Sequence, residues 1–387
     1  MKQWRVLITM ILFLMASTLV KAATPVVPPV SPTPTGNATG AVVPDPLAVD
    51  NTPMVTPLPI PSVAGTETRL LPSNFDVWSC DWAPDGKAMI FSGKKQGEIS
   101  TKMRIWLWPL DPISNPVLIT NTDNLTDFSP RWSPDGKQLV LMRVKYGNRD
   151  NASGLWLKDI SNGAGRQLTV GNQDRDPFWS PDGRRIVFSR STGPYQSQLM
   201  IIDTVLNSME VLRSQSNELI SSPWWGRDGR IYFTKMNPAP QAVTVGGETY
   251  QVVEFGKGSI WAINPDDQSV TPIVVDEYDN RMPALSPDGT KLAFVSNRYQ
   301  GKDGNGKFDR GSLYLKDLVT GEIKFVTNKV GLNGGSLSWS PDGKKLAFFT
   351  FRSIRPAVWV INVEPLLAPP VAPDSLTPAT ATPILPN

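Results

Sequence analysis

The chain contains no histidine and only one cysteine, Cys80, among its 387 residues. The absence of histidine removes the usual general base of serine and cysteine hydrolases and the commonest protein ligand of transition metals. A single cysteine cannot form an internal disulfide, so we expect the fold to depend on a hydrophobic core and sheet hydrogen bonds. Cys80 lies between Trp78 and Trp82, where a free thiol without a basic neighbour behaves as a small hydrophobic residue.

A surplus of positive charge is also missing once the N-terminus is set aside. The chain has 38 basic and 35 acidic residues, and three of the basic ones, Lys2, Arg5 and Lys21, lie in the first 23 residues, where no acidic residue occurs. The remainder therefore has 35 basic against 35 acidic residues. A phosphate-binding surface needs clustered lysine and arginine, so we expect no nucleic-acid partner.

Residues 1–23 have the pattern of a secretory signal peptide. The basic start MKQWR precedes an uncharged, mainly apolar run over residues 6–20, and small residues follow at 22 and 23. This run is shorter than the roughly 20 residues that span a bilayer comfortably. We therefore expect cleavage and an extracytoplasmic location, whether secreted, cell-surface or periplasmic. Membrane contact is expected only if the segment is kept as an anchor.

Two proline-rich segments flank the centre of the chain. Residues 24–64 contain eleven prolines and two charged residues, and residues 365–387 contain seven prolines and no aromatic or basic residue. Such segments bury too little apolar surface to offset the entropy of ordering, and proline favours extended conformations. We predict a linker over residues 24–64 and a disordered tail over residues 366–387.

Residues 65–365 contain six copies of one motif. Three copies read WSPDG, and three vary it; the copies begin at Trp82, Trp132, Trp179, Trp225, Leu285 and Trp339. Their Asp-Gly glycines are 50, 47, 46, 60 and 54 residues apart. This spacing is close to the ~40–50 residues of a four-stranded propeller blade. Proline, aspartate and glycine in this order suit a tight turn, so we nominate none of these aspartates as catalytic.

Short alternating and apolar stretches around each copy supply the strands of a blade. After Ile361 the chain leaves no room for a fourth strand in the last blade, whereas residues 67–71 have no partner before the first turn. Pairing these two ends abolishes an open sheet edge. We therefore predict an all-β, six-bladed β-propeller with four-stranded blades, in which the N-terminal strand at residues 67–71 closes the sixth blade.

The longer signature DRDPFWSPDG, residues 174–183, resembles the WD-like repeats of TolB-like propellers. The resemblance extends over residues 65–365, although Gly226-Arg227 replaces Ser-Pro in the fourth copy and Leu285 replaces tryptophan in the fifth. It implies a non-catalytic platform for protein interactions. The N-terminal domain that accompanies the propeller in that family is replaced here by the proline-rich linker, so the family's role in outer-membrane assembly does not transfer automatically.

In a propeller, the loops between second and third strands, and between consecutive blades, emerge on one face around the channel, and binding is most plausible there. We call this the channel face. We predict that its binding residues are Asp127, Arg143, Asp174, Asp176, Arg190, Asp279, Arg298 and Arg352. This mixture of charges suits a protein or peptide partner, and we expect the chain to be a monomer.

Two insertions interrupt the repeats. Residues 236–258 indicate an added hairpin around Gly246-Gly247, which we expect over the channel face as a partner-binding arm or as a lid packed on its own blade. In the fifth blade, Asp303, Asn305 and Asp309 have the ligand types of a short Ca²⁺ loop. Lys307 stands where an oxygen ligand would be useful and no bidentate glutamate follows, so a flexible hairpin without a cofactor is favoured.

The leading hypothesis is an extracytoplasmic, non-catalytic binding or scaffold protein. The alternative is a propeller hydrolase or lyase with a metal-dependent site in the central channel, because similar propellers precede peptidase domains or act as lactonases. No Gly-x-Ser-x-Gly elbow with its partners follows the propeller, and the inner-strand carboxylates are scattered. A purely structural, surface-displayed domain is the third possibility.

Overall fold

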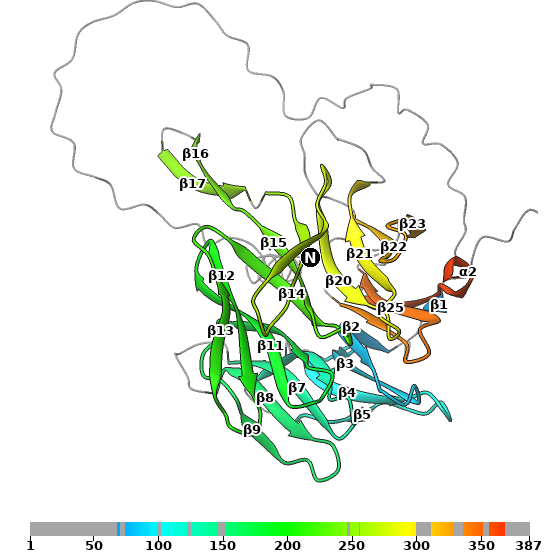
Figure 1. The fold of residues 1–387 in the computed structure, drawn as a ribbon. Helices are drawn as coiled ribbons and strands as arrows, with labels where there is room; N and C mark the ends of the chain where they lie inside the picture. Colours follow the sequence, from blue (N-terminus) through cyan, green and yellow to red (C-terminus); the bar gives the residue numbers. More distant parts are fainter. Residues whose placement is uncertain are drawn as a thin grey trace, which may run out of the picture. The chain divides into compact units, whose positions relative to one another are not determined.

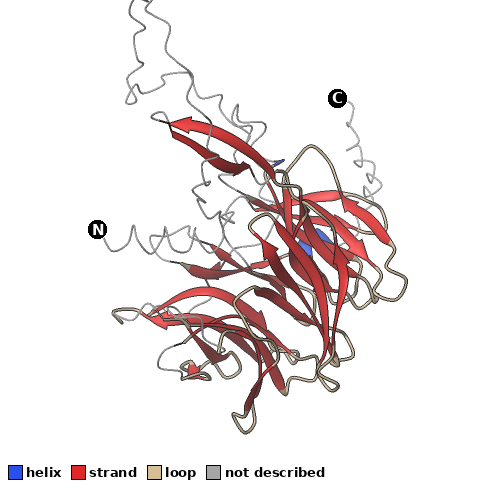
Figure 2. Ribbon diagram, turned by 90° about the vertical axis from the view of Figure 1, so that its left-hand side faces the viewer, coloured by secondary structure: helices blue, strands red, loops and turns tan. Residues whose placement is uncertain are grey.

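The computed structural model describes residues 68–69, 74–98, 102–121, 125–145, 152–245, 248–254, 256–298, 311–327, 336–350 and 356–367. The predicted signal peptide and linker, Arg352, and the three Ca²⁺ candidates Asp303, Asn305 and Asp309 lie outside these residues, as does nearly all of the predicted tail. Regular structure is almost entirely strand (Figure 2). Within the described residues, no helix combines the length and the apolar character of a membrane span.

The first three blades are consecutive four-stranded antiparallel meanders (Figure 1). Blade 1 consists of β2 (Phe75–Trp82), β3 (Ala88–Lys95), β4 (Arg104–Pro109) and β5 (Val117–Leu118). Blade 2 consists of β6 (Thr126–Trp132), β7 (Gln138–Val144), β8 (Gly154–Asp159) and β9 (Gly165–Gln167). Blade 3 consists of β10 (Asp174–Trp179), β11 (Arg185–Gly193), β12 (Gln196–Asp203) and β13 (Met209–Ser214).

The remaining blades carry the insertion and the closure of the ring. Blade 4 consists of β14 (Leu219–Trp225), β15 (Ile231–Met236), β18 (Ser259–Ile263) and β19 (Val270–Val274). Blade 5 consists of β20 (Asn280–Leu285), β21 (Lys291–Ser296), β22 (Ser312–Asp317) and β23 (Ile323–Thr327). Blade 6 consists of β24 (Leu337–Trp339), β25 (Lys345–Thr350), β26 (Ala357–Asn362) and β1 (Thr68–Arg69), and the short helix α2 (Glu364–Leu367) follows it.

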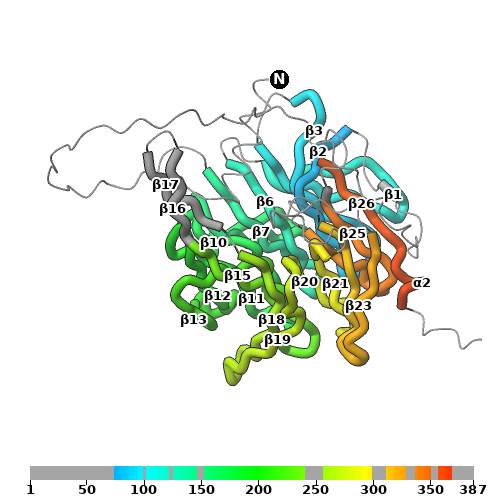
Figure 3. Tube along the Cα trace, turned by 90° about the horizontal axis from the view of Figure 1, so that it is seen from above, coloured from blue at the N-terminus to red at the C-terminus, as the bar shows by residue number. Residues whose placement is uncertain are grey.

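The ring closes as predicted, through an N-terminal strand. β1 pairs antiparallel with β26, with Thr68 opposite Val360 and Arg69 opposite Trp359. In Figure 3 the blue strands of blade 1 lie next to the red β26. Phe75 and Phe91 of blade 1 pack with Val358 and Val360 of blade 6 in one core cluster. The two ends of the propeller therefore share both a sheet and a hydrophobic core.

The core lies between neighbouring blades. Trp179 and Phe188 of blade 3, for example, pack with Val140 and Leu155 of blade 2. Trp339 and Leu285 occupy the same place at their own interfaces, so the first residue of the repeated motif fills the space between neighbouring blades. Cys80 is buried between blades 1 and 6, and burial raises the pKa of its thiol.

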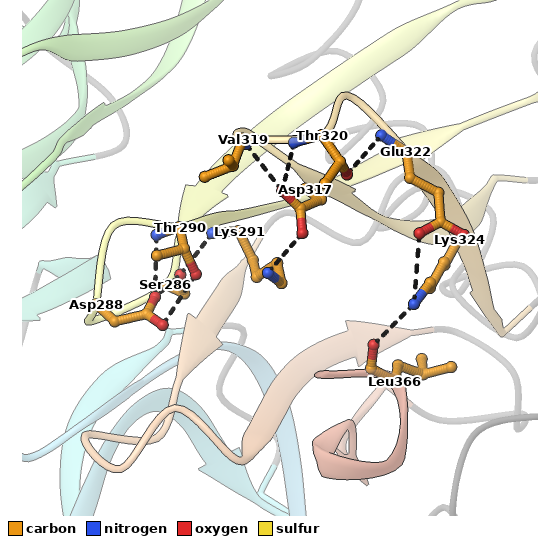
Figure 4. Close-up of polar contacts among 10 residues, drawn as sticks. All are labelled: Ser286, Asp288, Thr290, Lys291, Asp317, Val319, Thr320, Glu322, Lys324 and Leu366. Atoms are coloured by element: carbon orange, nitrogen blue, oxygen red, sulfur yellow. Dashed lines mark hydrogen bonds and ion pairs between the residues drawn. The ribbon is translucent and has the colours of Figure 1, made fainter. Parts of the chain in front are cut away.

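The Ser-Pro-Asp-Gly segments form the turns between the first and second strands. In blade 5, the Ser286 hydroxyl donates to Asp288 Oδ1 at 2.5 Å and accepts from the Lys291 N–H at 2.9 Å (Figure 4). Gly289 has a φ of 75°, a conformation that glycine adopts without strain. Where Gly226 replaces serine, the Tyr232 hydroxyl donates to Asp228 at 2.8 Å instead. These aspartates therefore act in turns, as predicted.

The insertion in blade 4 forms the predicted hairpin. β16 (Ala239–Val245) and β17 (Glu248–Glu254) make a separate two-stranded sheet, while β15 and β18 on either side pair directly with each other. Residues 240–252 belong to a compact unit distinct from that of the propeller. The placement of this hairpin over the channel face stays a prediction.

Candidate functional site

The innermost strands of blades 2 to 5 are each interrupted by a β-bulge just before the first residue of the repeated motif, which is tryptophan in blades 2 to 4 and Leu285 in blade 5. In each bulge the residue before a proline has a positive φ angle: Ser129 47°, Asp176 53°, Ser222 51° and Met282 59°. Residues with a side chain rarely adopt this conformation, and such strain gathers at functional sites. All four residues line one cavity.

This cavity, which we call the axial well, is built by the innermost strands of all six blades. Its lining residues are Ser79, Ser129, Arg131, Asp176, Pro177, Ser222, Pro223, Trp224, Met282, Pro283, Ser336 and Leu337. The space open to the centres of water molecules measures about 30 Å³, enough for about two waters. The axial well therefore suits the tip of one side chain better than a whole small molecule.

Arg131 lies at the end of the axial well nearest the Ser-Pro-Asp-Gly turns. There the Arg131 guanidinium stacks on two rings, 5.4 Å from the centre of Phe178 and 5.5 Å from that of Trp224. The two rings are themselves 4.2 Å apart. Arg131 Nη1 also lies 3.4 Å from the Leu337 carbonyl oxygen across the channel. Side chains from blades 2, 3 and 4 thus form a floor.

A buried carboxylate holds the floor in place. Asp81 accepts hydrogen bonds from Arg131 Nη1 at 3.2 Å, from the Trp132 N–H at 3.0 Å and from the Ser338 hydroxyl at 2.8 Å. Burial raises the pKa of the Asp81 carboxyl, and the charge of Arg131 and the two other donors oppose that shift. Because Ser338 belongs to blade 6, this network also ties the last blade to the first two.

Four of the predicted binding residues of the channel face form ion pairs with one another. Arg143 donates to both oxygens of Asp127 at 2.7 and 3.0 Å, and Arg190 donates to both oxygens of Asp174 at 2.6 and 2.9 Å. In each pair the two residues are directly opposite across the first two strands of a blade. Asp127 and Asp174 are almost completely buried. Their charges are therefore already compensated.

Asp279 and Arg298, the other predicted binding residues that the structure describes outside the axial well, also bind neighbouring side chains. Asp279 receives both hydrogen bonds of the Arg281 guanidinium, at 2.7 and 2.8 Å, and a third from the Gly258 N–H. Arg298 donates to Asp276 at 2.7 Å and stacks on Tyr278, Phe294 and Tyr314 at 5.2–5.3 Å. Of the predicted residues that the structure describes, Asp176 alone lines the axial well.

Sequence reasoning missed Ser79, Arg131 and Ser222 as lining residues. A usable signal was present, because Ser129, Asp176, Ser222 and Met282 all precede a proline two positions before the repeated Trp or Leu. Ser79 has no such signal, since blade 1 lacks that proline. Among the described residues, no three His, Cys, Asp or Glu side chains are grouped closely enough to hold a metal ion.

Comparisons with known proteins agree with this architecture. No protein-family model matches the chain. The Tol-Pal system protein TolB of Alcanivorax borkumensis is 38% identical over 82 residues, which cover 21% of this chain and 17% of that protein. An uncharacterized protein of Agrobacterium fabrum is 25% identical over 205 residues, 45% of this chain and 66% of the relative. The chain thus spans less than two thirds of either curated relative.

Solved structures share the fold, among them two TolB structures. TolB from Acinetobacter baumannii superposes with a TM-score of 0.52 and 18% identity, over 76% of this chain and 62% of that one. A candidate TolB from Agrobacterium tumefaciens superposes with a TM-score of 0.51 and 21% identity, over 74% of this chain and 90% of the other. In its fold, the chain is a TolB-like six-bladed β-propeller.

Proposed function

We propose that the chain is an extracytoplasmic, non-catalytic binding or scaffold protein that recognises a protein or peptide with the channel face of its propeller. The observation that carries this proposal is the axial well. It is a recess lined by four serines, by Asp176 and by Arg131, among residues from the innermost strands of all six blades. Such a recess accepts a protruding group of a larger partner.

The chemistry of the surrounding acids supports binding over metal-dependent catalysis. A catalytic cation in the channel needs carboxylate oxygens that are available as ligands. Asp127, Asp174 and Asp279 each give both oxygens to an arginine side chain. Withdrawing them would leave three buried or half-buried arginines uncompensated, at a cost in stability.

The proposed location follows from residues 1–23, whose basic start, apolar run and small residues form a secretory signal pattern. A relative also supports a partner-binding role, because TolB of Alcanivorax borkumensis is a Tol-Pal system protein. This relative does not identify the partner of the present chain.

The channel face is tested with a photo-crosslinking amino acid at one of two exposed valines. Val170 lies in the loop between β9 and β10 and is 63% exposed, whereas Val319 lies in the turn between β22 and β23, on the opposite face, and is 83% exposed. Introduced into the full chain in its native cells, the probe at position 170 should give a discrete crosslinked partner that the probe at position 319 does not. Equal crosslinking at both positions, or none at either, would contradict the proposal.

A further inference from the structure

We propose that the axial well binds a single primary ammonium group, with Asp176 as its counter-ion. The inference deepens the proposed function, on which it rests, by naming the chemistry of the group that enters the well. A lysine side chain or the amino terminus of a peptide would supply that group.

The charge of the axial well comes from Asp176. Its two charged lining residues are Arg131 and Asp176. Arg131 already binds Asp81 and the Leu337 carbonyl and stacks on two rings, so its charge is committed to the floor. Asp176 binds only one protein donor among its described contacts, the Ser222 N–H, which lies 3.1 Å from Oδ2. A cation in the well therefore meets an available carboxylate oxygen.

The rest of the lining is also suited to a hydrogen-bond donor. Four serines, Ser79, Ser129, Ser222 and Ser336, line the axial well together with Asp176, and serine residues offer hydroxyl and carbonyl oxygens as acceptors. An ammonium group has three donors and no acceptor, which matches a site made of a carboxylate and hydroxyls.

Size and rigidity also fit an ammonium group. The well has room for about two water-sized groups, so an ammonium and its neighbouring methylene fill it. Asp176 and Ser222 both stand before a proline in a strained conformation, which fixes the direction of Asp176 and of the backbone N–H that it accepts from. The acceptors are thus held in position before any ligand arrives.

The test uses the full chain and two small amines at constant ionic strength. Butylammonium represents a lysine side chain and glycinamide represents a peptide amino terminus; tetramethylammonium, which has no N–H donor, and butyrate are the controls. Binding is measured by calorimetry and by the rise in melting temperature. Because these ligands are small, we expect dissociation constants no tighter than about 1 mM for the amine that fits, and no binding of either control.

The decisive variant is Asp176→Asn. Asparagine tolerates a positive φ and still accepts the Ser222 N–H, so the fold is kept while the charge is lost. We expect amine binding at least about tenfold weaker, the loss of a charge-assisted hydrogen bond. Glu277→Gln is the matched control, because it removes an exposed acid from the loop before β20 and should leave amine binding unchanged.

Each result bears on the inference. Binding of butylammonium alone assigns the well to lysine side chains, and binding of glycinamide alone assigns it to amino termini. Failure of both amines, equal binding of tetramethylammonium or butyrate, or full binding by the Asp176→Asn variant overturns the inference. If the probe at position 170 still captures its partner in that event, the proposed function stands without the ammonium site.

Discussion

The turns and the axial well contrast in how they satisfy their polar groups. Within the turns, partners are two to five residues apart, as where Ser180 donates to Asp182 and accepts from the Arg185 N–H. Around the axial well, partners come from different blades: Asp81 binds Arg131, 50 residues away, and Ser338, 257 residues away. Each turn is therefore self-sufficient, whereas the axial well depends on the closed ring.

This difference separates stability from function in the repeat. A turn that satisfies its own aspartate can be repeated six times without regard to the other blades. The well has no such repetition, because the residue at the bulge varies between blades: serine in blades 2 and 4, Asp176 in blade 3 and Met282 in blade 5. Variation at one defined point of a regular scaffold is how a propeller acquires an individual site.

The largest effect is expected from removing the charge that compensates Asp81. Arg131→Met keeps most of the side-chain volume but leaves a buried carboxylate without its cation, which should lower the free energy of unfolding by about 3–5 kcal/mol. Urea denaturation at neutral pH measures this loss. The penalty should shrink on acidification, because an uncompensated buried carboxylate has a raised pKa in the folded state and is stable there once protonated.

The control for this variant is Arg184→Met in the turn of blade 3. Arg184 also pairs with an aspartate, Asp203, but its side chain is 54% exposed, so we expect a loss of about 0–1 kcal/mol. Similar losses for Arg131→Met and Arg184→Met would contradict the contrast between the turns and the axial well.

A smaller effect is expected at the arginine–aspartate pairs of the channel face. Asp127→Asn should cost about 2–3 kcal/mol and Asp174→Asn about 1–2 kcal/mol, since each variant loses a charge-assisted hydrogen bond. The order follows from exposure, because Arg143 is 10% exposed and water reaches it less than Arg190, which is 26% exposed. Urea denaturation of both variants measures the two losses of unfolding free energy. A larger loss for Asp174→Asn would show that exposure of the arginine does not set the loss.

The same contrast separates the features that the sequence predicts from those that it does not. The six turns, the strand order and the closure by residues 67–71 were predicted because each depends on local residue chemistry or on counting strands. Asp176 was nominated, but Arg131, Asp81 and Ser79 were not. Their role depends on which side chains meet on the axis once six blades close, and no sequence spacing encodes that meeting. For the same reason, the paired state of Asp127 and Asp174 required the strand register.

Two serine-to-alanine variants sharpen the comparison further. Ser180→Ala removes a hydroxyl that bonds both Asp182 and the Arg185 N–H, so we expect a loss of about 1 kcal/mol. Ser79→Ala removes a buried hydroxyl without a protein partner among the described residues, so we expect no loss of stability in an amine-free buffer. Thermal and urea denaturation of the two variants measures both values, and a larger loss for Ser79→Ala would mean that its hydroxyl has a stabilising partner.

The smallest effect concerns the acid sensitivity of the turns. The Ser180 hydroxyl, followed by the Arg184 N–H, holds the pKa of the Asp182 carboxyl below its ordinary value, although partial burial acts in the opposite direction. A carboxyl with a lowered folded pKa stabilises the protein above its unfolded pKa of about 3.9, and this contribution is lost as the pH falls through the folded value. In Ser180→Ala the pKa of Asp182 should rise toward the ordinary value, and the decline in stability below about pH 4 should become shallower. Carboxyl-detected NMR titration of Asp182 measures the first effect directly. An unchanged pKa would mean that the backbone N–H of Arg184 alone holds this carboxylate, and that the serine of the repeat serves only to accept from the strand that follows.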